Sequence, residues 1–168
     1  MARKHVLPER LRPGLDLVFC GTAAGRQSAL TGTYYAHPQN RFWRTLHEVG
    51  LTPRLFHPHE YELLWEHGIG LTDIAKFASG MDHQLPPQAL GQRAARALRQ
   101  RVQAVAPRHL AFTSLKAGRS VLGPKAAAGE QPERLGATRI LLLPSPSPLA
   151  ANHWDIAPWR ALAGAVKS

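Results

Sequence analysis

Four segments of the chain carry the residue types from which a binding or catalytic site could be built. They are residues 21–28, 34–40, 72–73 and 145–153. The first, GTAAGRQS, begins with a glycine and small residues directly after an apolar run. Such a turn lets the backbone approach a ligand closely and lets bare N–H groups face an anion or a carbonyl oxygen. It lacks the GxxxxGK[ST] pattern, so we do not expect a nucleoside triphosphate site.

The second segment lies within YYAHPQNRFW and is dense in aromatic rings. In a loop, Tyr35 could offer a stacking face to a nucleic-acid base. The alternative is that this tyrosine, Tyr34 and Trp43 are core packing. Asn40 is also well placed to cap the helix that we expect after it.

The last segment, PSPSPLAANHW, has three prolines in five residues, which favours a rigid, exposed loop. Leu149 would then be an exposed apolar side chain, and one use for it is as a wedge pushed into a base stack. The alternative is a buried leucine that anchors the loop.

Composition limits the class of protein. The chain has 168 residues, which suffice for one domain, and its 44% apolar and 19% charged residues are ordinary for a globular fold. The single cysteine, Cys20, excludes an intrachain disulfide and any cysteine-built zinc or iron–sulfur site. No apolar run is long enough to span a membrane, and the basic N-terminus lacks the apolar region of a secretory signal. We therefore expect a cytoplasmic protein with no membrane partner.

The charge is strongly positive, with 21 Lys and Arg against 11 acidic residues and a net charge of +10. A field of this sign favours polyanions, nucleic acid first and an anionic membrane second. The excess of arginine over lysine fits bidentate phosphate contacts. A high-GC codon bias, which raises arginine in every protein of a source, would give the same composition.

Strands are predicted to alternate with helices. The predicted strands are residues 15–21, 69–74, 109–113 and 137–143, and the predicted helices are 40–49, 58–67, 87–106, 115–122 and 154–166. The predicted loops are residues 22–39, 77–87 and 123–136. Residues 1–14 are expected to form a mobile basic arm, and residues 15–168 a single domain. We predict an α/β three-layer sandwich, with a central, mainly parallel sheet and helices on both faces. Such folds place their sites at the carboxyl ends of the strands.

These segments, in this order, resemble the mismatch-specific uracil-DNA glycosylases of the uracil-DNA glycosylase superfamily. The resemblance runs from about Leu15 to Trp159 and is strongest in VFCGTAAGRQSALTGTYYAHPQNRFW. GIGLTDIAK and ILLLPSPSPLA are similar to two further segments of the family, the second to its LPNPSGLS loop. The resemblance implies hydrolysis of the N-glycosidic bond of a damaged base, chiefly uracil, that is flipped out of DNA. It implies an enzyme that needs no metal and no cofactor, and DNA containing uracil or an abasic site as the partner. We expect a monomer, because an enzyme built from a wedge and a pocket needs no partner subunit.

The resemblance also implies roles for individual residues. Leu149 matches the wedge leucine, Tyr35 the aromatic that stacks on the flipped base, and Ser28 a serine near the target phosphate. The base pocket would include Thr22, Ala23, Ala24, Tyr35 and Asn40. The expected DNA-binding residues are Arg26, Ser28, Arg41, Lys116, Arg119, Ser147 and Leu149.

The sequence departs from the family at its catalytic positions. Ala23 replaces the Asn of the family's GINPG turn and cannot orient water. Ser145 stands where most branches have Asn or His, and Pro148 where the mismatch-specific family has Gly. Asp73 is the one acid in a matched pocket segment, so we expect it to position water and to stabilise the cationic sugar, with Ser145 or His153 as donors to the leaving base. The alternatives are that Asp73 caps a helix or ties a loop and that His153 is a solvated surface residue.

Other acids and functions remain open. Asp82 and Asp155 fall on no matched pocket position and are weaker candidates. Lys76 lies three residues beyond Asp73, and no matched lysine is placed for Schiff-base chemistry, so we expect a monofunctional enzyme. Ala23 supports an alternative, a non-catalytic uracil- or abasic-site binder. Further alternatives are a glycosylase for another deaminated base, such as hypoxanthine, and a generic single-strand nucleic-acid binder.

Overall fold

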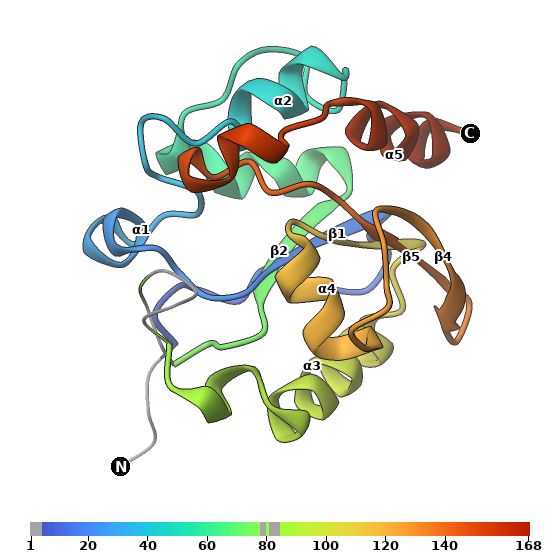
Figure 1. Ribbon diagram of the computed structural model, residues 1–168. Coiled ribbons are helices and arrows are strands. Elements are labelled where there is room, and N and C mark those ends of the chain that lie inside the picture. The colour runs from blue at the N-terminus through green and yellow to red at the C-terminus, as the bar shows by residue number, and fades with distance from the viewer. Residues whose placement is uncertain (1–4, 78–79, 81–84) are drawn as a thin grey trace.

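Five strands form one sheet in the computed structural model, which describes residues 5–77, Gly80 and residues 85–168 (Figure 1). The order across the sheet is β2-β1-β3-β5-β4. The strands are β1 (Leu17–Gly21), β2 (Ile69–Asp73), β3 (His109–Phe112), β4 (Gly129–Leu135) and β5 (Thr138–Leu142). All neighbours are parallel except β4, which runs antiparallel to β5 at the edge. The central strands are fully buried, as their continuous apolar sequences predict.

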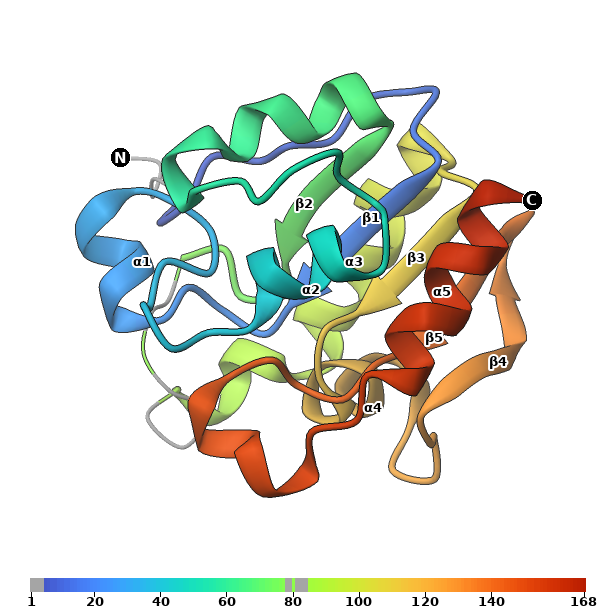
Figure 2. The ribbon, with the colours of Figure 1, turned by 90° about the horizontal axis from the view of Figure 1, so that it is seen from above.

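Helices cover both faces of this sheet, and the predicted three-layer α/β sandwich is confirmed (Figure 2). One face carries α2 (Phe42–Glu48), the 3₁₀ helix η1 (Pro58–His67) and α5 (Ala157–Lys167). The other face carries α3 (Gln92–Val105) and α4 (Leu115–Leu122). None of the helices in the described part of the chain is long and apolar enough to cross a membrane.

Two cores hold the layers together. The first is rich in aromatic rings, because Phe19 of β1 stacks on Trp159 of α5 and meets the edge of Phe42 of α2. The second is aliphatic and joins Leu98 and Val102 of α3 to the opposite face of the sheet. In β1, β3 and β5, successive residues pack alternately into the first and the second core, as the two-residue period of a strand requires.

Two elements lie inside segments that we predicted to be loops. The short helix α1 (Arg26–Thr31) interrupts 22–39, and β4 occupies part of 123–136. Neither element has a strong apolar pattern in the sequence, since Ser28 is the one buried residue of α1 and most of β4 is exposed. The predicted helix 87–106 is broken at Gly91 into η3 (Pro87–Leu90) and α3, and the Pro-rich loop contains the 3₁₀ helix η4 (Pro148–His153).

The N-terminal segment is fixed to the domain from His5 onward, and this differs from the mobile arm we expected for residues 1–14. Leu7 is buried in the first core, and Arg10 forms an antiparallel bridge with Leu71 of β2. The Val6 amide donates a hydrogen bond of 2.8 Å to the carbonyl oxygen of Lys76. The physical reason is that the exposed side of β2 offers unpaired backbone groups, which the segment satisfies. Residues 1–4 lie outside the described residues.

Candidate active site

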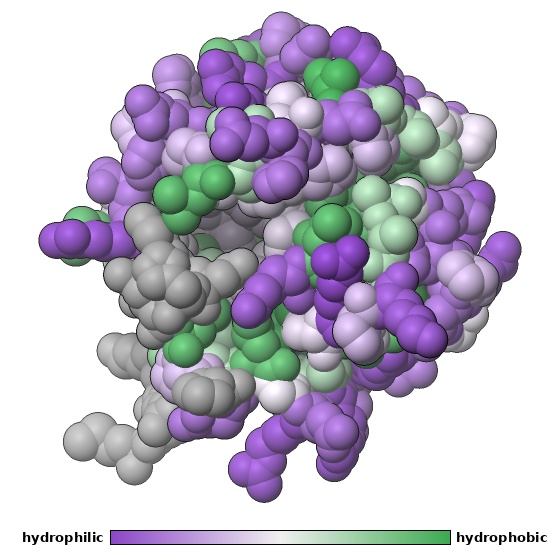
Figure 3. Space-filling view, in the orientation of Figure 1, coloured by the Kyte–Doolittle hydropathy of each residue, from purple (hydrophilic) through white to green (hydrophobic). Residues whose placement is uncertain are grey.

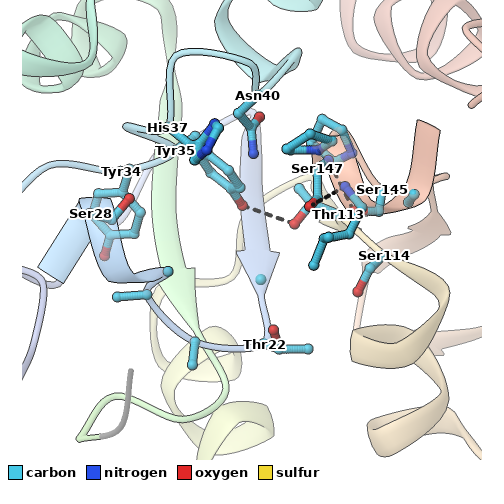
Figure 4. A pocket seen from close by; sticks show the side chains of 18 of the residues that line it. Thr22, Ser28, Tyr34, Tyr35, His37, Asn40, Thr113, Ser114, Ser145 and Ser147 are labelled. Carbon is cyan, nitrogen blue, oxygen red and sulfur yellow. Dashed lines mark hydrogen bonds between the residues drawn. The ribbon is translucent and has the colours of Figure 1, made fainter. Parts of the chain in front are cut away.

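A cavity of about 1080 Å³ lies at the carboxyl ends of β1, β2, β3 and β5, at the edge where we predicted the site (Figure 3). It sits where the connections from β1 and β3 leave in opposite directions, which is the usual place for ligands in a parallel sheet. One wall carries Ser28, Tyr34, Tyr35, His37 and Asn40, and the other carries Thr113, Ser114, Ser145 and Ser147 (Figure 4). The four segments singled out in the sequence therefore meet in one place.

Asp73 is the last residue of β2, lies beside Gly21 in the sheet and is only 4% exposed. It lines the cavity. Burial raises the pKa of its carboxyl to about 6; Lys76 and Arg101 oppose this shift, and Glu9 adds to it. At neutral pH the cavity therefore contains a buried anion that is held in place by backbone pairing.

Gly21 makes room for this carboxylate. A Cβ atom at Gly21 would lie 2.8 Å from Asp73 Oδ1 and 3.3 Å from the Tyr35 hydroxyl oxygen. The contact with Asp73 is too short for carbon and the contact with Tyr35 is tight, so a larger residue at position 21 would displace the carboxylate. The glycine that ends β1 is needed for the close approach of side chains, in addition to the turn that follows it.

Tyr35 is held in a set orientation at the cavity wall. Its ring stacks on Phe42 with centroids 3.9 Å apart, and its hydroxyl lies 2.9 Å from Thr113 Oγ1. Its backbone adopts a left-handed conformation with φ of 52°, which is uncommon for a residue with a side chain. Burial and the nearby Asp73 raise the pKa of its phenol, so it stays protonated. Tyr34 and Trp43, in contrast, are buried in the first core.

The loop after β1, residues 22–25, is held by backbone hydrogen bonds to the segment that follows β2. The Thr22 carbonyl accepts a bond from the Ala75 amide and the Ala24 carbonyl one from the Gly80 amide. Thr22, Ala23 and Ala24 all line the cavity. Ser28 is buried and its Oγ accepts a bond of 3.0 Å from the Ala36 amide, so it also ties α1 to the aromatic loop.

Asn40 lies directly before Arg41, and Arg41 occupies the N-cap position of α2 that we expected Asn40 to fill. Asn40 Oδ1 accepts a hydrogen bond of 2.8 Å from the Phe42 amide at the start of α2. The same residue lines the cavity. Its side chain therefore orders the aromatic wall by fixing the beginning of the helix that carries Phe42.

The Pro-rich loop is braced by its own serines. The Ser147 amide donates to Ser145 Oγ at 3.2 Å, and the Leu149 amide donates to Ser147 Oγ at 3.2 Å. Leu149 lines the cavity and is 68% exposed, so it is not the buried anchor considered as an alternative. His153 also lines the cavity and faces solvent at the end of η4.

The expected basic residues divide into two groups. Arg26 and Lys116 are exposed and line the cavity. Arg41 lines a smaller neighbouring cavity of about 400 Å³, and its guanidinium lies 5.6 Å from the centroid of Trp154. Arg119 lies outside both linings and donates a hydrogen bond to the Ala126 carbonyl.

Several lining residues were missed by the sequence analysis. Thr113 and Ser114 follow β3 directly, and Ser114 caps α4 by accepting a bond from the Ala117 amide. The strand was predicted, so the rule that sites lie at strand ends could have found them. Of the two weaker acid candidates, Asp155 lies outside the cavity lining and accepts a bond from the Ala157 amide at the start of α5. Asp82 lies outside the described residues.

A cavity at this place in a parallel sheet, with a buried carboxylate on its floor, defines a ligand-binding α/β protein of the kind that includes many enzymes. The sequence model of the Uracil DNA glycosylase superfamily matches residues 8–163, and the chain belongs to this superfamily. The family predicted from the sequence is thus confirmed at the level of the superfamily. Membership supports a DNA-glycosylase role, with DNA as the substrate.

The fold is shared with a candidate uracil DNA glycosylase from Methanosarcina acetivorans, whose structure was determined by NMR in solution. The TM-score is 0.66, with 19% sequence identity over 100% of both chains. At this identity the likeness establishes a common fold, and the roles of individual residues must be argued from the cavity itself.

Proposed function

We propose that the protein is a monofunctional uracil-DNA glycosylase, which hydrolyses the N-glycosidic bond of a uracil flipped out of DNA and leaves an abasic site. The observation that carries the proposal is the buried Asp73 carboxylate in a cavity whose rim presents the exposed Leu149. Because the target bond lies inside the duplex, the base must be extruded and held while another group fills its place in the stack.

In this proposal Asp73 is the catalytic residue. Cleavage builds positive charge on the sugar and negative charge on the base, so a carboxylate beside the sugar stabilises the first and holds the attacking water. Asp73 performs both roles as an anion, and its pKa of about 6 leaves it ionised at neutral pH. The buried surroundings also strengthen its attraction for a cation.

Donors to the leaving base come from other parts of the cavity. Ser145 Oγ already accepts a bond from the Ser147 amide, so its own proton is free to donate. His153 is a second donor, and the amides of Ala23 and Ala24 face the base carbonyl. Tyr35 stacks on the base, with its ring orientation set by Phe42.

The DNA strand is held at the mouth of the cavity. Its phosphates are contacted there by Arg26, Ser28, Lys116 and Ser147, and further along the strand by Arg41 and Arg119. In this proposal water is the nucleophile, and the protein acts as a monomer without a cofactor.

Single-turnover cleavage of uracil oligonucleotides tests the proposal. We expect the wild type to release uracil from single strands or from U:G and U:A duplexes, and Asp73→Asn to lose at least about two orders of magnitude in rate, the size typical of a lost charge-stabilising group. Asp155→Asn is the matched control, because Asp155 is exposed and lies outside the cavity lining. Unchanged cleavage by Asp73→Asn would remove Asp73 from the mechanism.

A second candidate function rests on Ala23, which brings no polar side chain to the turn after β1. A non-catalytic binder of uracil or abasic DNA would use the same cavity and wedge. Absence of base release by the wild type, combined with tighter binding to uracil or abasic DNA than to undamaged DNA, would favour this function. Release of hypoxanthine in place of uracil would change the substrate and leave the reaction class as proposed.

A further inference from the structure

Four charged side chains, two of each sign, gather at the floor of the cavity, and Asp73 is the one among them that lines it. We call Glu9, Asp73, Lys76 and Arg101 the charged cluster. Glu9 lies between the two cations, with Oε2 at 2.9 Å from Arg101 Nε and Oε1 at 3.8 Å from Lys76 Nζ. Arg101 also donates a hydrogen bond of 2.7 Å to the carbonyl oxygen of Asp73. The cluster thus connects the N-terminal segment, the end of β2 and α3.

Lys76 is the unusual member, because its side chain is only 2% exposed. A buried ammonium needs partners. Lys76 Nζ donates to the Tyr34 hydroxyl at 3.1 Å, and that hydroxyl donates to the Pro8 carbonyl at 2.7 Å. Lys76 does not line the cavity, whereas Asp73 and Tyr34 do. We therefore expect any effect of Lys76 on the reaction to pass through a neighbouring side chain.

We propose that Lys76 is a positioning residue for the reaction: its buried ammonium keeps the Asp73 carboxylate charged inside the cavity, and Glu9 limits how strongly it does so. This inference rests on the proposed function, since it concerns the group that we expect to act on the sugar. The alternative is that Lys76 only fastens the N-terminal segment to the domain.

The charges around Asp73 support this assignment. Burial is the largest influence and raises its pKa; Lys76 lowers the pKa, Glu9 raises it and Arg101 lowers it. The other titratable groups affected by Asp73 are Cys20, Tyr34 and Tyr35, whose pKa values are all raised. These three groups are neutral at pH 7. The influence of ionised groups on the pKa of Asp73 therefore comes from Lys76, Arg101 and Glu9. Because Asp73 and Lys76 are buried, salt screens the interaction between them weakly.

The test is the pH profile of single-turnover cleavage by Lys76→Met and Glu9→Gln. The rate follows the ionised fraction of Asp73, which falls tenfold per pH unit on the acid side. We expect Lys76→Met to move the acid limb upward by about one pH unit, which lowers the rate there about tenfold and leaves the rate at pH 9 close to that of the wild type. Glu9→Gln should move the limb downward. Glu66→Gln, which removes an exposed carboxylate of η1, should leave it in place.

Shifts of opposite sign distinguish an electrostatic role from a structural one. Loosening the N-terminal segment would lower the rate of both variants at every pH and would overturn the inference, as would acid limbs that do not move. If Lys76→Met fails to fold, Glu9→Gln still tests the inference. An acid limb of Glu9→Gln that stays in place or moves to higher pH overturns it.

A second readout separates this inference from the proposed function. Titration of the Asp73 carboxyl carbon by NMR needs no cleavage, and it should show the same opposite shifts in Lys76→Met and Glu9→Gln. Failure of the wild type to release any base would refute the proposed function, while the titration would still show whether Lys76 controls the charge of Asp73.

Discussion

At the scale of single residues, Asp73 has a cost in stability that follows from its proposed role. Its pKa rises from an ordinary value of 3.8 to about 6 on folding, mainly through burial. A raised pKa means that the folded state binds the proton more tightly than the unfolded state does. The group therefore favours folding most below about pH 4, and this contribution is lost as the pH rises to 6. By this linkage the ionised carboxylate costs roughly 2–3 kcal/mol above pH 6.

Asp73→Asn should therefore be more stable than the wild type at neutral pH, even though it is expected to be inactive. Urea unfolding between pH 4.5 and 8 should show a stability gain that grows up to pH 6 and then stays constant at roughly 1–3 kcal/mol. Asp155→Asn, at an exposed position, serves as the control. A gain for Asp73→Asn that does not vary with pH would show that the carboxylate is not the source of the cost.

Leu149 allows activity to be separated from stability. Its side chain is 68% exposed, so Leu149→Ala should change the free energy of unfolding by less than about 0.5 kcal/mol. As a wedge it would offset the unstacking of a duplex, which costs a few kcal/mol, so we expect at least about a tenfold slower cleavage of duplex DNA. Single-stranded substrate, which has no such stack to open, should be affected much less.

Leu55→Ala is the matched control, because Leu55 is another leucine with 45% exposure that does not line the cavity. Single-turnover rates on both substrates, measured for the two variants, give the comparison. Equal losses on duplex and single strand after Leu149→Ala would argue against a wedge and for a general role of the loop.

At the scale of elements, the contact of α4 with β5 determines where one wall of the cavity lies. A Cβ atom at Gly118 would lie 2.6 Å from Leu142 Cδ2, in a buried interface. Gly118→Ala should therefore destabilise the fold by about 1–3 kcal/mol through overpacking. Gly164 of α5 is exposed, with nothing within 4 Å of its Cβ position, so Gly164→Ala should stabilise by about 0.5–1 kcal/mol.

Thermal unfolding of these two variants measures both effects. Ser114 caps α4 and Lys116 lies in its first turn, and both residues line the cavity. Gly118→Ala should therefore also slow cleavage, whereas Gly164→Ala should not. A stable Gly118→Ala protein would mean that α4 can move away from the sheet without cost.

The elements that the sequence predicted well are those with a strong apolar pattern. Strands β1 and β3 are continuous apolar runs, and Leu98 and Val102 mark the buried stripe of α3. Strand β4 was missed because it is a polar edge strand with Pro132 inside it and an irregular register between Glu130 and Arg134. The position of residues 5–14 could not be read from composition either, since it depends on backbone pairing with β2.

The same limit applies to the site. The sequence indicated that Asp73 and Tyr35 belong to pocket segments, because both lie in recognisable motifs. It could not indicate that Gly21 makes room for both, or that Glu9 lies near Lys76, because these contacts join segments far apart in the chain. Chemistry that depends on residue type was predictable, whereas chemistry that depends on neighbours needed the folded chain.

At the scale of the whole molecule, which has a net charge of +10, the cations differ in whether they are paired with carboxylates. Many arginines are neutralised by carboxylates away from the cavity, as in the pairs Arg99–Glu133, Arg108–Asp16 and Arg160–Glu48. Neither Arg26 nor Lys116 takes part in an ion pair within the described residues. Free cations are thus present at the mouth of the cavity, where a DNA strand would release counterions on binding.

Salt dependence of DNA binding separates this arrangement from a merely compositional excess of arginine. Affinity for an abasic-site duplex, measured by fluorescence anisotropy over a range of KCl concentrations, should fall steeply with salt. Arg26→Gln should lower the slope of log Kd against log salt by about 1, whereas Arg93→Gln, at an exposed position outside the cavity lining, should leave it unchanged. Equal effects of the two variants would mean that the charge acts through the whole surface, as a codon bias would produce, and that the cavity mouth has no special part in holding the strand.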